Sequence, residues 1–176
     1  SPRWTGSDWW WVDAEAGNVW RSEQLQRGVS APAMALGERV SLVHPAVDGG
    51  VVIARSTSIQ RAVAGSDGWE PAATWADLEL PEGTLLNDGV ADPVGRLWIG
   101  SVGPHREPDE GSLIRIDPDG TVTEVMAGFA LSNGMAWDSR EHALLHVDSL
   151  ARTVWRHRVD PHAGTVIDSS HVLDIK

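Results

Sequence analysis

The chain of 176 residues contains no cysteine, which excludes disulfide bonds, thiolate metal sites and a cysteine nucleophile. It also lacks tyrosine and has one lysine, Lys176, against 13 arginines. No apolar run approaches the ~20 residues that cross a bilayer, and no basic, apolar secretory signal opens the chain. We therefore expect no membrane partner. The excess of Arg, Gly, Ala, Val and Trp indicates a GC-rich bacterial genome, and a cytoplasmic location is the expectation.

Basic charge is scarce as well. The chain has 25 acidic side chains against 14 basic ones, for a net charge of −11. Nucleic-acid-binding proteins usually carry a basic stripe, so this balance argues against a nucleic-acid partner. It is compatible with a cation site, although most acidic residues of a soluble protein are solvated surface. The 41% hydrophobic content is typical of a soluble globular protein with a core.

The sequence repeats itself with a period of 46 residues. The short sequences Leu-Asn-Asp-Gly and Leu-Ser-Asn-Gly contain Asn87 and Asn133, which are 133 − 87 = 46 residues apart. Asp92 and Asp138 follow the asparagines by five residues each and keep the same offset. A fixed period of roughly 40–50 residues is typical of β-propeller blades. Because Asn and Gly favour turns, we expect both asparagines to lie in turns and both aspartates to serve the turns that follow.

A second register supports the same period. The dipeptide Val-Asp at 12–13 recurs at 147–148, a shift of 148 − 13 = 135 residues, or three times 45. Short apolar segments separated by Gly, Pro, Asn and Asp predict strands along the whole chain. The segment 97–102 is apolar on both faces, as a strand between neighbouring blades should be. The segment 70–82, with two prolines, is expected to connect two blades. The sequence therefore predicts an all-β fold.

Four segments of the chain carry recognisable motifs. The longest is 86–100, Leu-Asn-Asp-Gly-Val-Ala-Asp-Pro-Val-Gly-Arg-Leu-Trp-Ile-Gly. The others are Ser-Pro-Arg-Trp at 1–4, Gly-Ser-Leu-Ile-Arg at 111–115, and Ser-Asn-Gly at 132–134, which is followed by Val-Asp-Ser. Together these segments resemble the regucalcin/gluconolactonase family, also called the senescence marker protein family. The resemblance implies a six-bladed β-propeller, of which residues 1–176 would form about four blades, incomplete and truncated at both ends.

The resemblance also implies a function. Members of the family hold one divalent cation at the mouth of the central channel and hydrolyse lactones. Asn133 would be a metal ligand, and Asn87 would contact the substrate or a bound water. Asp88 would either support the metal site indirectly or only shape its turn. His105 falls near a family glutamate that lines the substrate pocket, and Leu85 replaces a frequent arginine. These two departures favour a more apolar lactone or ester over a sugar-acid lactone.

Both carboxylate ligands of the family's cation would lie outside this chain, one just before Ser1 and the other, also the proposed general base, beyond Lys176. Ca²⁺, Zn²⁺ and Mg²⁺ are the candidate cations. Hard cations such as Ca²⁺ take six to eight oxygen ligands, so we expect incomplete cation binding and no activity from this chain alone. In a longer parent protein, the cation would polarise the lactone carbonyl and the aspartate would activate water.

Other interpretations remain open at this point. The chain is alternatively part of a phosphotriesterase-like hydrolase on the same fold, or of a non-catalytic calcium-binding propeller. Four units of ~44 residues would also fill a complete four-bladed propeller. A truncated propeller would expose blade edges that favour self-association. His142 and His146 are four residues apart but lie in an expected strand, so we expect them to face solvent.

Overall fold

The computed structural model of the chain describes residues 2–23 and 31–175, and within them it contains strands and turns but no helix. The chain divides into two compact units, Ser1–Glu79 and Leu80–Lys176. Each unit holds two four-stranded antiparallel sheets in which consecutive strands are neighbours, the topology of a propeller blade. The all-β fold with four blades is therefore confirmed, whereas a six-bladed whole stays a prediction. Of the family-like segment at 1–4, Ser1 lies outside the described residues.

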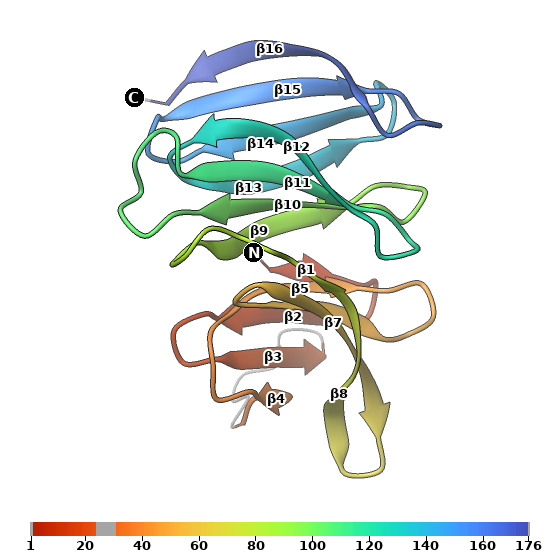
Figure 1. The fold of residues 1–176 in the computed structure, drawn as a ribbon. Helices are drawn as coiled ribbons and strands as arrows, with labels where there is room; N and C mark the ends of the chain where they lie inside the picture. The colour runs from red at the N-terminus through yellow and green to blue at the C-terminus, as the bar shows by residue number, and fades with distance from the viewer. Residues whose placement is uncertain (1, 24–30, 176) are drawn as a thin grey trace. The chain divides into compact units, whose positions relative to one another are not determined.

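The first unit contains the sheets β1–β4 and β5–β8 (Figure 1). Their strands are β1 Arg3–Trp4, β2 Asp8–Asp13, β3 Asn18–Glu23, β4 Met34–Ala35, β5 Val40–Pro45, β6 Val51–Arg55, β7 Ser58–Gly65 and β8 Gly68–Asp77. Apolar side chains of both sheets form one core, which contains Trp10, Val19, Met34, Val40, Val43, Val51, Ile53 and Ala62. The two sheets of this unit are thus packed against each other.

The second unit contains the sheets β9–β12 and β13–β16, drawn from green to blue in Figure 1. Their strands are β9 Leu85–Ala91, β10 Leu97–Val102, β11 Gly111–Ile116, β12 Val122–Phe129, β13 Ser132–Asp138, β14 Ala143–Asp148, β15 Thr153–Val159 and β16 Val166–Asp174. The shared core contains Trp98, Leu113, Phe129, Met135, Leu144 and Val159. No helix that could cross a membrane occurs among residues 2–23 and 31–175.

The strand boundaries follow the sequence repeat. Strand β10 begins at Leu97 and β14 at Ala143, which are 143 − 97 = 46 residues apart. Strands β2 and β14 end at Asp13 and Asp148, the 135-residue shift of the second register. All six residues of β10 are buried, which confirms that this strand is covered on both faces. Each repeat therefore corresponds to one sheet.

Residues 70–77 do not connect blades as the sequence predicted. They belong to β8, a ten-residue strand in which Pro71 lies opposite Ala62, next to a shift in register. Because β8 is the outer strand of its sheet, it uses only some of its backbone donors and can include a residue that has no N–H. Only the remainder of the predicted connection, 78–82, lies between two strands.

The prediction that Asn87 and Asn133 lie in turns is also wrong. Both lie near the start of a strand, Asn87 in β9 and Asn133 in β13. Each strand is irregular at that point: the β9–β10 register shifts around Gly100, and Gly134, with φ of 35°, is the extra residue of a bulge against β14. Asn and Gly favour bulges and turns for the same conformational reason, and the long-range pairing decides between them.

Candidate functional site

Asn87 and Asn133 meet where β9 and β13 lie side by side. The side-chain amide of Asn87 donates from Nδ2 to the backbone oxygen of Ser132, at 3.0 Å. Ser132 is the residue directly before Asn133, so the two asparagines come from different sheets but are separated by one backbone unit. Both are half-buried. The structure therefore brings together the two residues that the repeat singled out.

The amide of Asn133 is held by a turn behind it. Its Nδ2 lies 3.2 Å from the hydroxyl oxygen of Ser149, which leaves the carbonyl oxygen as the atom able to bind a cation or a substrate proton. The preceding residue, Asp148, is buried and its carboxylate accepts hydrogen bonds from four backbone N–H groups, those of Ala130, Leu131, Leu150 and Ala151. Asp148 therefore holds two segments, 130–131, which precedes Asn133, and 150–151, which follows Ser149.

Asp88 ties the two sheets together. Its Oδ2 accepts a hydrogen bond from the backbone N–H of Met135, at 3.3 Å, and its side chain is buried. Met135 lies two residues after Asn133, just past the bulge at Gly134. Asp88 thus helps to set the spacing between β9 and β13, and with it the spacing between the asparagines.

The loop 103–110 lies at the same end of the sheet as Asn87. It follows Val102, which pairs with Leu85 at the start of β9. Pro104 lies against Gly83, whose added Cβ would come within 3.1 Å of the proline ring. The loop that the sequence associated with substrate therefore begins beside the strand that carries Asn87.

His105 and Glu110 interact within this loop. The Nδ1 atom of His105 lies 2.7 Å from Glu110 Oε1, and the backbone N–H groups of His105 and Glu107 donate to Glu110 Oε2. The hydrogen bond from His105, with smaller contributions from the two backbone groups, lowers the pKa of Glu110. The His105 side chain is 75% exposed. The Glu110 carboxylate thus shapes the loop itself.

A serine–histidine pair lies directly beneath the asparagines and was not anticipated. Ser132 Oγ is 2.7 Å from His146 Nε2, and His146 Nδ1 is 3.3 Å from His157 Nε2. All three side chains are fully buried, at 0% exposure, so the prediction that His146 faces solvent is wrong. A serine next to a histidine is the arrangement of an activated nucleophile, but Ser132 has no surface at which a substrate could reach it.

Burial also determines the charge of these histidines. Desolvation lowers the pKa of His146 to about 3, with the neighbouring His157 as a smaller cause, and lowers the pKa of His157 to about 4. Both rings are therefore neutral at physiological pH. The spacing of His142 and His146 was visible in the sequence, but only the packing of Phe129 against the His146 ring, 4.5 Å between centroids, shows that His146 is internal.

Gly100 permits the close approach of the two sheets at Ser132. A Cβ atom at this position would lie 2.4 Å from Ser132 Oγ and 2.6 Å from Ser132 O. We expect Gly100→Ala to lower the free energy of unfolding by about 1–3 kcal/mol, because the backbone oxygen cannot move without shifting β13. Denaturant titration measures the change.

Gly65→Ala is the matched control for that substitution. There the added Cβ would meet mainly the flexible end of Glu70, at 2.9 Å, and we expect a change within about 0.5 kcal/mol. Equal losses for the two variants would show that Gly100 is not a point of close contact.

The described residues supply only part of a cation site. Nowhere within 2–23 and 31–175 do three histidine or acidic side chains form a group that could hold a metal ion. The candidate donors are the amide oxygens of Asn87 and Asn133, which are neutral. A hard cation requires more oxygen ligands, several of them charged. These residues therefore do not fit a complete cation site by themselves.

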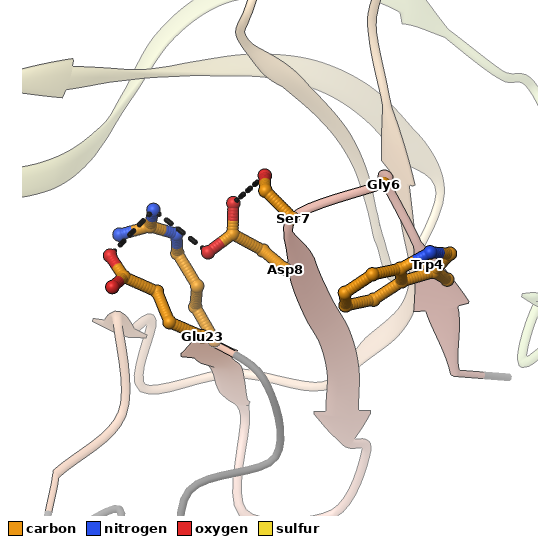
Figure 2. Close-up of a pocket in the computed structure, with 6 residues that line it drawn as sticks. Trp4, Gly6, Ser7, Asp8 and Glu23 are labelled. Atoms are coloured by element: carbon orange, nitrogen blue, oxygen red, sulfur yellow. Dashed lines mark hydrogen bonds and ion pairs between the residues drawn. The ribbon is translucent and has the colours of Figure 1, made fainter.

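The first unit contains a separate open pocket with a volume of about 480 Å³, lined by Trp4, Gly6, Ser7, Asp8, Arg21 and Glu23. Figure 2 shows Asp8 hydrogen-bonded to Ser7. Arg21 pairs with Asp8 at 2.9 Å and with Glu23 at 3.4 Å. The two carboxylates share the one guanidinium, so the charged groups of this pocket are already engaged with one another.

Comparisons with known proteins bear on the family and the fold. The family model described as "SMP-30/Gluconolactonase/LRE-like region" matches residues 1–176. The chain is 31% identical over 166 residues to pentonolactonase XacC of Haloferax volcanii, covering 89% of this chain and 51% of that protein. It is 29% identical over 155 residues to 6-deoxy-6-sulfogluconolactonase of Pseudomonas putida, covering 86% and 50%.

A solved structure supports the fold. The calcium-binding protein regucalcin from Agrobacterium tumefaciens superposes with a TM-score of 0.84 at 22% identity, covering 99% of this chain and 58% of that one. The chain thus spans about half the length of the two lactonases. Because the family model matches throughout, the chain belongs to the SMP-30/gluconolactonase/LRE-like family.

Proposed function

We propose that the protein to which this chain belongs hydrolyses a small lactone or ester, with the Asn87–Asn133 site as the chain's share of the catalytic centre. The observation that carries the proposal is the hydrogen bond from Asn87 to Ser132 O, which brings two polar amides from two sheets to one place. The relatives named pentonolactonase and 6-deoxy-6-sulfogluconolactonase support the reaction class.

In this proposal each residue has a distinct role. Asn133 presents its carbonyl oxygen to a divalent cation, because its Nδ2 is engaged by Ser149. Asn87 contacts the substrate or a bound water. Asp88 keeps β9 and β13 at a fixed spacing through the Met135 N–H. Among the described residues we assign no general base and no charged ligand, and a bound cation would supply electrophilic activation of the lactone carbonyl.

We further propose that the substrate is less polar than a sugar-acid lactone. The loop 103–110 contains three carboxylates, and that of Glu110 is engaged by His105 and by the loop's own backbone. The neighbouring position on β9 is Leu85, an apolar residue. A polyhydroxylated ring requires several free polar partners, because each hydroxyl left without one loses its hydrogen bonds to water.

The test measures hydrolysis of a γ-butyrolactone, a pentonolactone and a phosphotriester, with and without Ca²⁺, Zn²⁺ or Mg²⁺. We expect no turnover by the 176-residue chain and cation-dependent lactone hydrolysis by the product of the complete reading frame. In that product, Asn133→Ala should reduce kcat/KM by about 10²–10³-fold, the loss typical when one stabilising group of a site is removed.

Asn18→Ala is the control, since Asn18 is the remaining asparagine of the chain and lies in β3 of the other unit. It should retain full activity. Turnover that is unchanged in Asn133→Ala would reject the site, and preference for the phosphotriester would reject the lactone.

A binding function without turnover is the second candidate. The Agrobacterium relative is described as a calcium-binding protein, and amide oxygens are ordinary calcium ligands. Calorimetry on the complete product distinguishes the two functions. Saturable Ca²⁺ binding without hydrolysis of any substrate in the panel would favour a calcium-binding protein over an enzyme.

A further inference from the structure

Four polar side chains form a continuous hydrogen-bonded chain across the last sheet, one from each strand. Ser132 in β13 contacts His146 in β14 at 2.7 Å, His146 contacts His157 in β15 at 3.3 Å, and His157 Nδ1 lies 2.8 Å from Ser169 Oγ in β16. We call these four residues the serine–histidine chain. It starts at Ser132, which accepts the Asn87 amide and precedes Asn133, and it ends at Ser169, an exposed residue of the outer strand β16.

The cross-strand register explains how these residues meet. Ser132 lies opposite Asp148, His146 opposite Trp155, and His157 opposite Ser169. Alternate residues of a strand share one face, so all four side chains lie on one face of the sheet. That face packs against the sheet β9–β12, because Phe129 covers the His146 ring and Gly100 abuts Ser132.

The available donors and acceptors determine which atom donates at each step of the serine–histidine chain. Within the part of the protein that the structure describes, the Ser132 hydroxyl has one partner, His146 Nε2. If His146 donated to Ser132, the Ser132 proton would be buried without an acceptor, which is costly. The favourable order is therefore Ser132 Oγ–H to His146 Nε2, His146 Nδ1–H to His157 Nε2, and His157 Nδ1–H to Ser169 Oγ. Ser169 is exposed and donates to water.

This order requires both histidines to be neutral and to carry their proton on Nδ1. Burial already makes them neutral near pH 7, because it lowers the pKa of His146 to about 3 and that of His157 to about 4. In this state each buried donor and each ring nitrogen of the two histidines has a hydrogen-bond partner. The serine–histidine chain therefore has one arrangement in which all its hydrogen bonds are made.

We propose that the serine–histidine chain positions the Asn87–Asn133 site by fixing Ser132, so that Ser132, His146 and His157 are positioning residues. The Ser132 side chain is bound to His146, while its backbone oxygen accepts the Asn87 amide. Its next neighbour is Asn133. A rotation of Ser132 would therefore move the acceptor of Asn87 and the backbone of Asn133 together. The inference rests on the proposed function only for the use made of these two amides.

The test is NMR spectroscopy of the ¹⁵N-labelled 176-residue chain and does not depend on hydrolysis. Long-range ¹H–¹⁵N spectra at pH 7 should show His146 and His157 as neutral Nδ1–H tautomers. An Nε2–H tautomer at His146 would overturn the proposal, whatever the outcome of the lactone assays.

Two substitutions at His157 separate positioning from mere packing. His157→Gln keeps an oxygen at the position of Nε2, so His146 retains an acceptor, whereas His157→Leu removes it. We expect the Gln variant to keep the His146 tautomer and the Asn87 side-chain signals. The Leu variant should shift the tautomer and speed hydrogen exchange of the Asn87 amide about tenfold, the effect of weakening one ordinary hydrogen bond.

His142→Asn is the control, because His142 is exposed, belongs to the same sheet region and has φ of 49°, which asparagine tolerates. It should leave both signals in place. Equal Asn87 exchange in the Gln and Leu variants would show that His157 serves only to fill space. If the Leu variant does not fold, the tautomers of the unmodified chain decide the question.

Discussion

Replacing Asp92 by alanine is expected to lower the free energy of unfolding by about 3–5 kcal/mol, since it removes one partner of a buried ion pair. The Asp92 side chain has no exposed surface and that of Arg96 is 6% exposed, with Oδ2 and Nε 2.7 Å apart. The same carboxylate accepts hydrogen bonds from the N–H groups of Val94 and Arg96 and from the Trp98 indole. The alanine variant would leave the buried Arg96 guanidinium with its hydrogen bond to Pro161 O but without its carboxylate.

Asp138→Ala is a matched control, because Asp138 occupies the equivalent position 46 residues later. Among the residues that the structure describes, its carboxylate accepts hydrogen bonds from two backbone N–H groups, those of Arg140 and Glu141, both exposed. We expect a loss of about 1 kcal/mol, comparable to that of a lost capping side chain. Denaturant titration at pH 7 compares the two variants, and losses of equal size would contradict a special role for the Asp92–Arg96 pair.

A double substitution sharpens the test of Asp92. Combining Asp92→Ala with Arg96→Met removes both charges and keeps an apolar side chain in the place of the arginine. Buried pairs replaced together by apolar groups often cost little, so the double variant should recover most of the stability lost in Asp92→Ala. If it is less stable than the single variant, the cost comes from the turn at Val94 rather than from the unpaired charge.

The contrast between Asp92 and Asp138 shows what a repeat predicts and what it leaves open. The period fixed the strand boundaries and the turn that follows each aspartate, because those depend on the backbone pattern shared by all blades. Arg96 and His142 follow the two aspartates by four residues each, and their side chains differ in charge and in length. Asp92 is buried beside Arg96 whereas Asp138 is half-buried, and the repeat alone does not contain that difference.

The asparagines show a different limit. The repeat singled out Asn87 and Asn133, and in the structure Asn87 donates to the backbone oxygen of Ser132, the residue before Asn133. It did not predict that they lie within strands, because Asn-Asp-Gly and Asn-Gly serve turns and bulges equally well. The choice is made by pairing with β10 and β14, whose paired residues lie up to 102 − 85 = 17 residues away in sequence. Their catalytic and ligand roles stay predictions.

The two buried histidines could not be identified from sequence, and they have the largest expected effect on the response to pH. His146 and His157 have folded-state pKa values of about 3 and about 4, below the ordinary value of 6.5. Between these values the unfolded chain binds protons that the folded chain excludes. Stability is therefore fully present above pH 6.5 and falls as the pH drops toward 4.

The expected loss is large enough to measure in a narrow range. At pH 5 each histidine lowers the free energy of unfolding by about 2 kcal/mol, since each pH unit below 6.5 contributes about 1.36 kcal/mol over about 1.5 units. The pair together therefore accounts for about 4 kcal/mol. Surface carboxylates such as Asp48, Asp119 and Asp160 have pKa values lowered from 3.8 by their hydrogen bonds. They contribute only at lower pH. Denaturant titrations at pH 7 and pH 5 therefore measure the loss with little contribution from these carboxylates.

Substituting both histidines by glutamine should remove most of this dependence, because glutamine does not titrate and can still accept or donate a hydrogen bond. The single substitution His142→Asn should leave it unchanged, since His142 is exposed. A chain equally stable at pH 7 and pH 5 would mean that both rings accept a proton without unfolding. In that case His146 would be a cation in contact with Ser132, and the fixed order of hydrogen bonds in the serine–histidine chain would not exist.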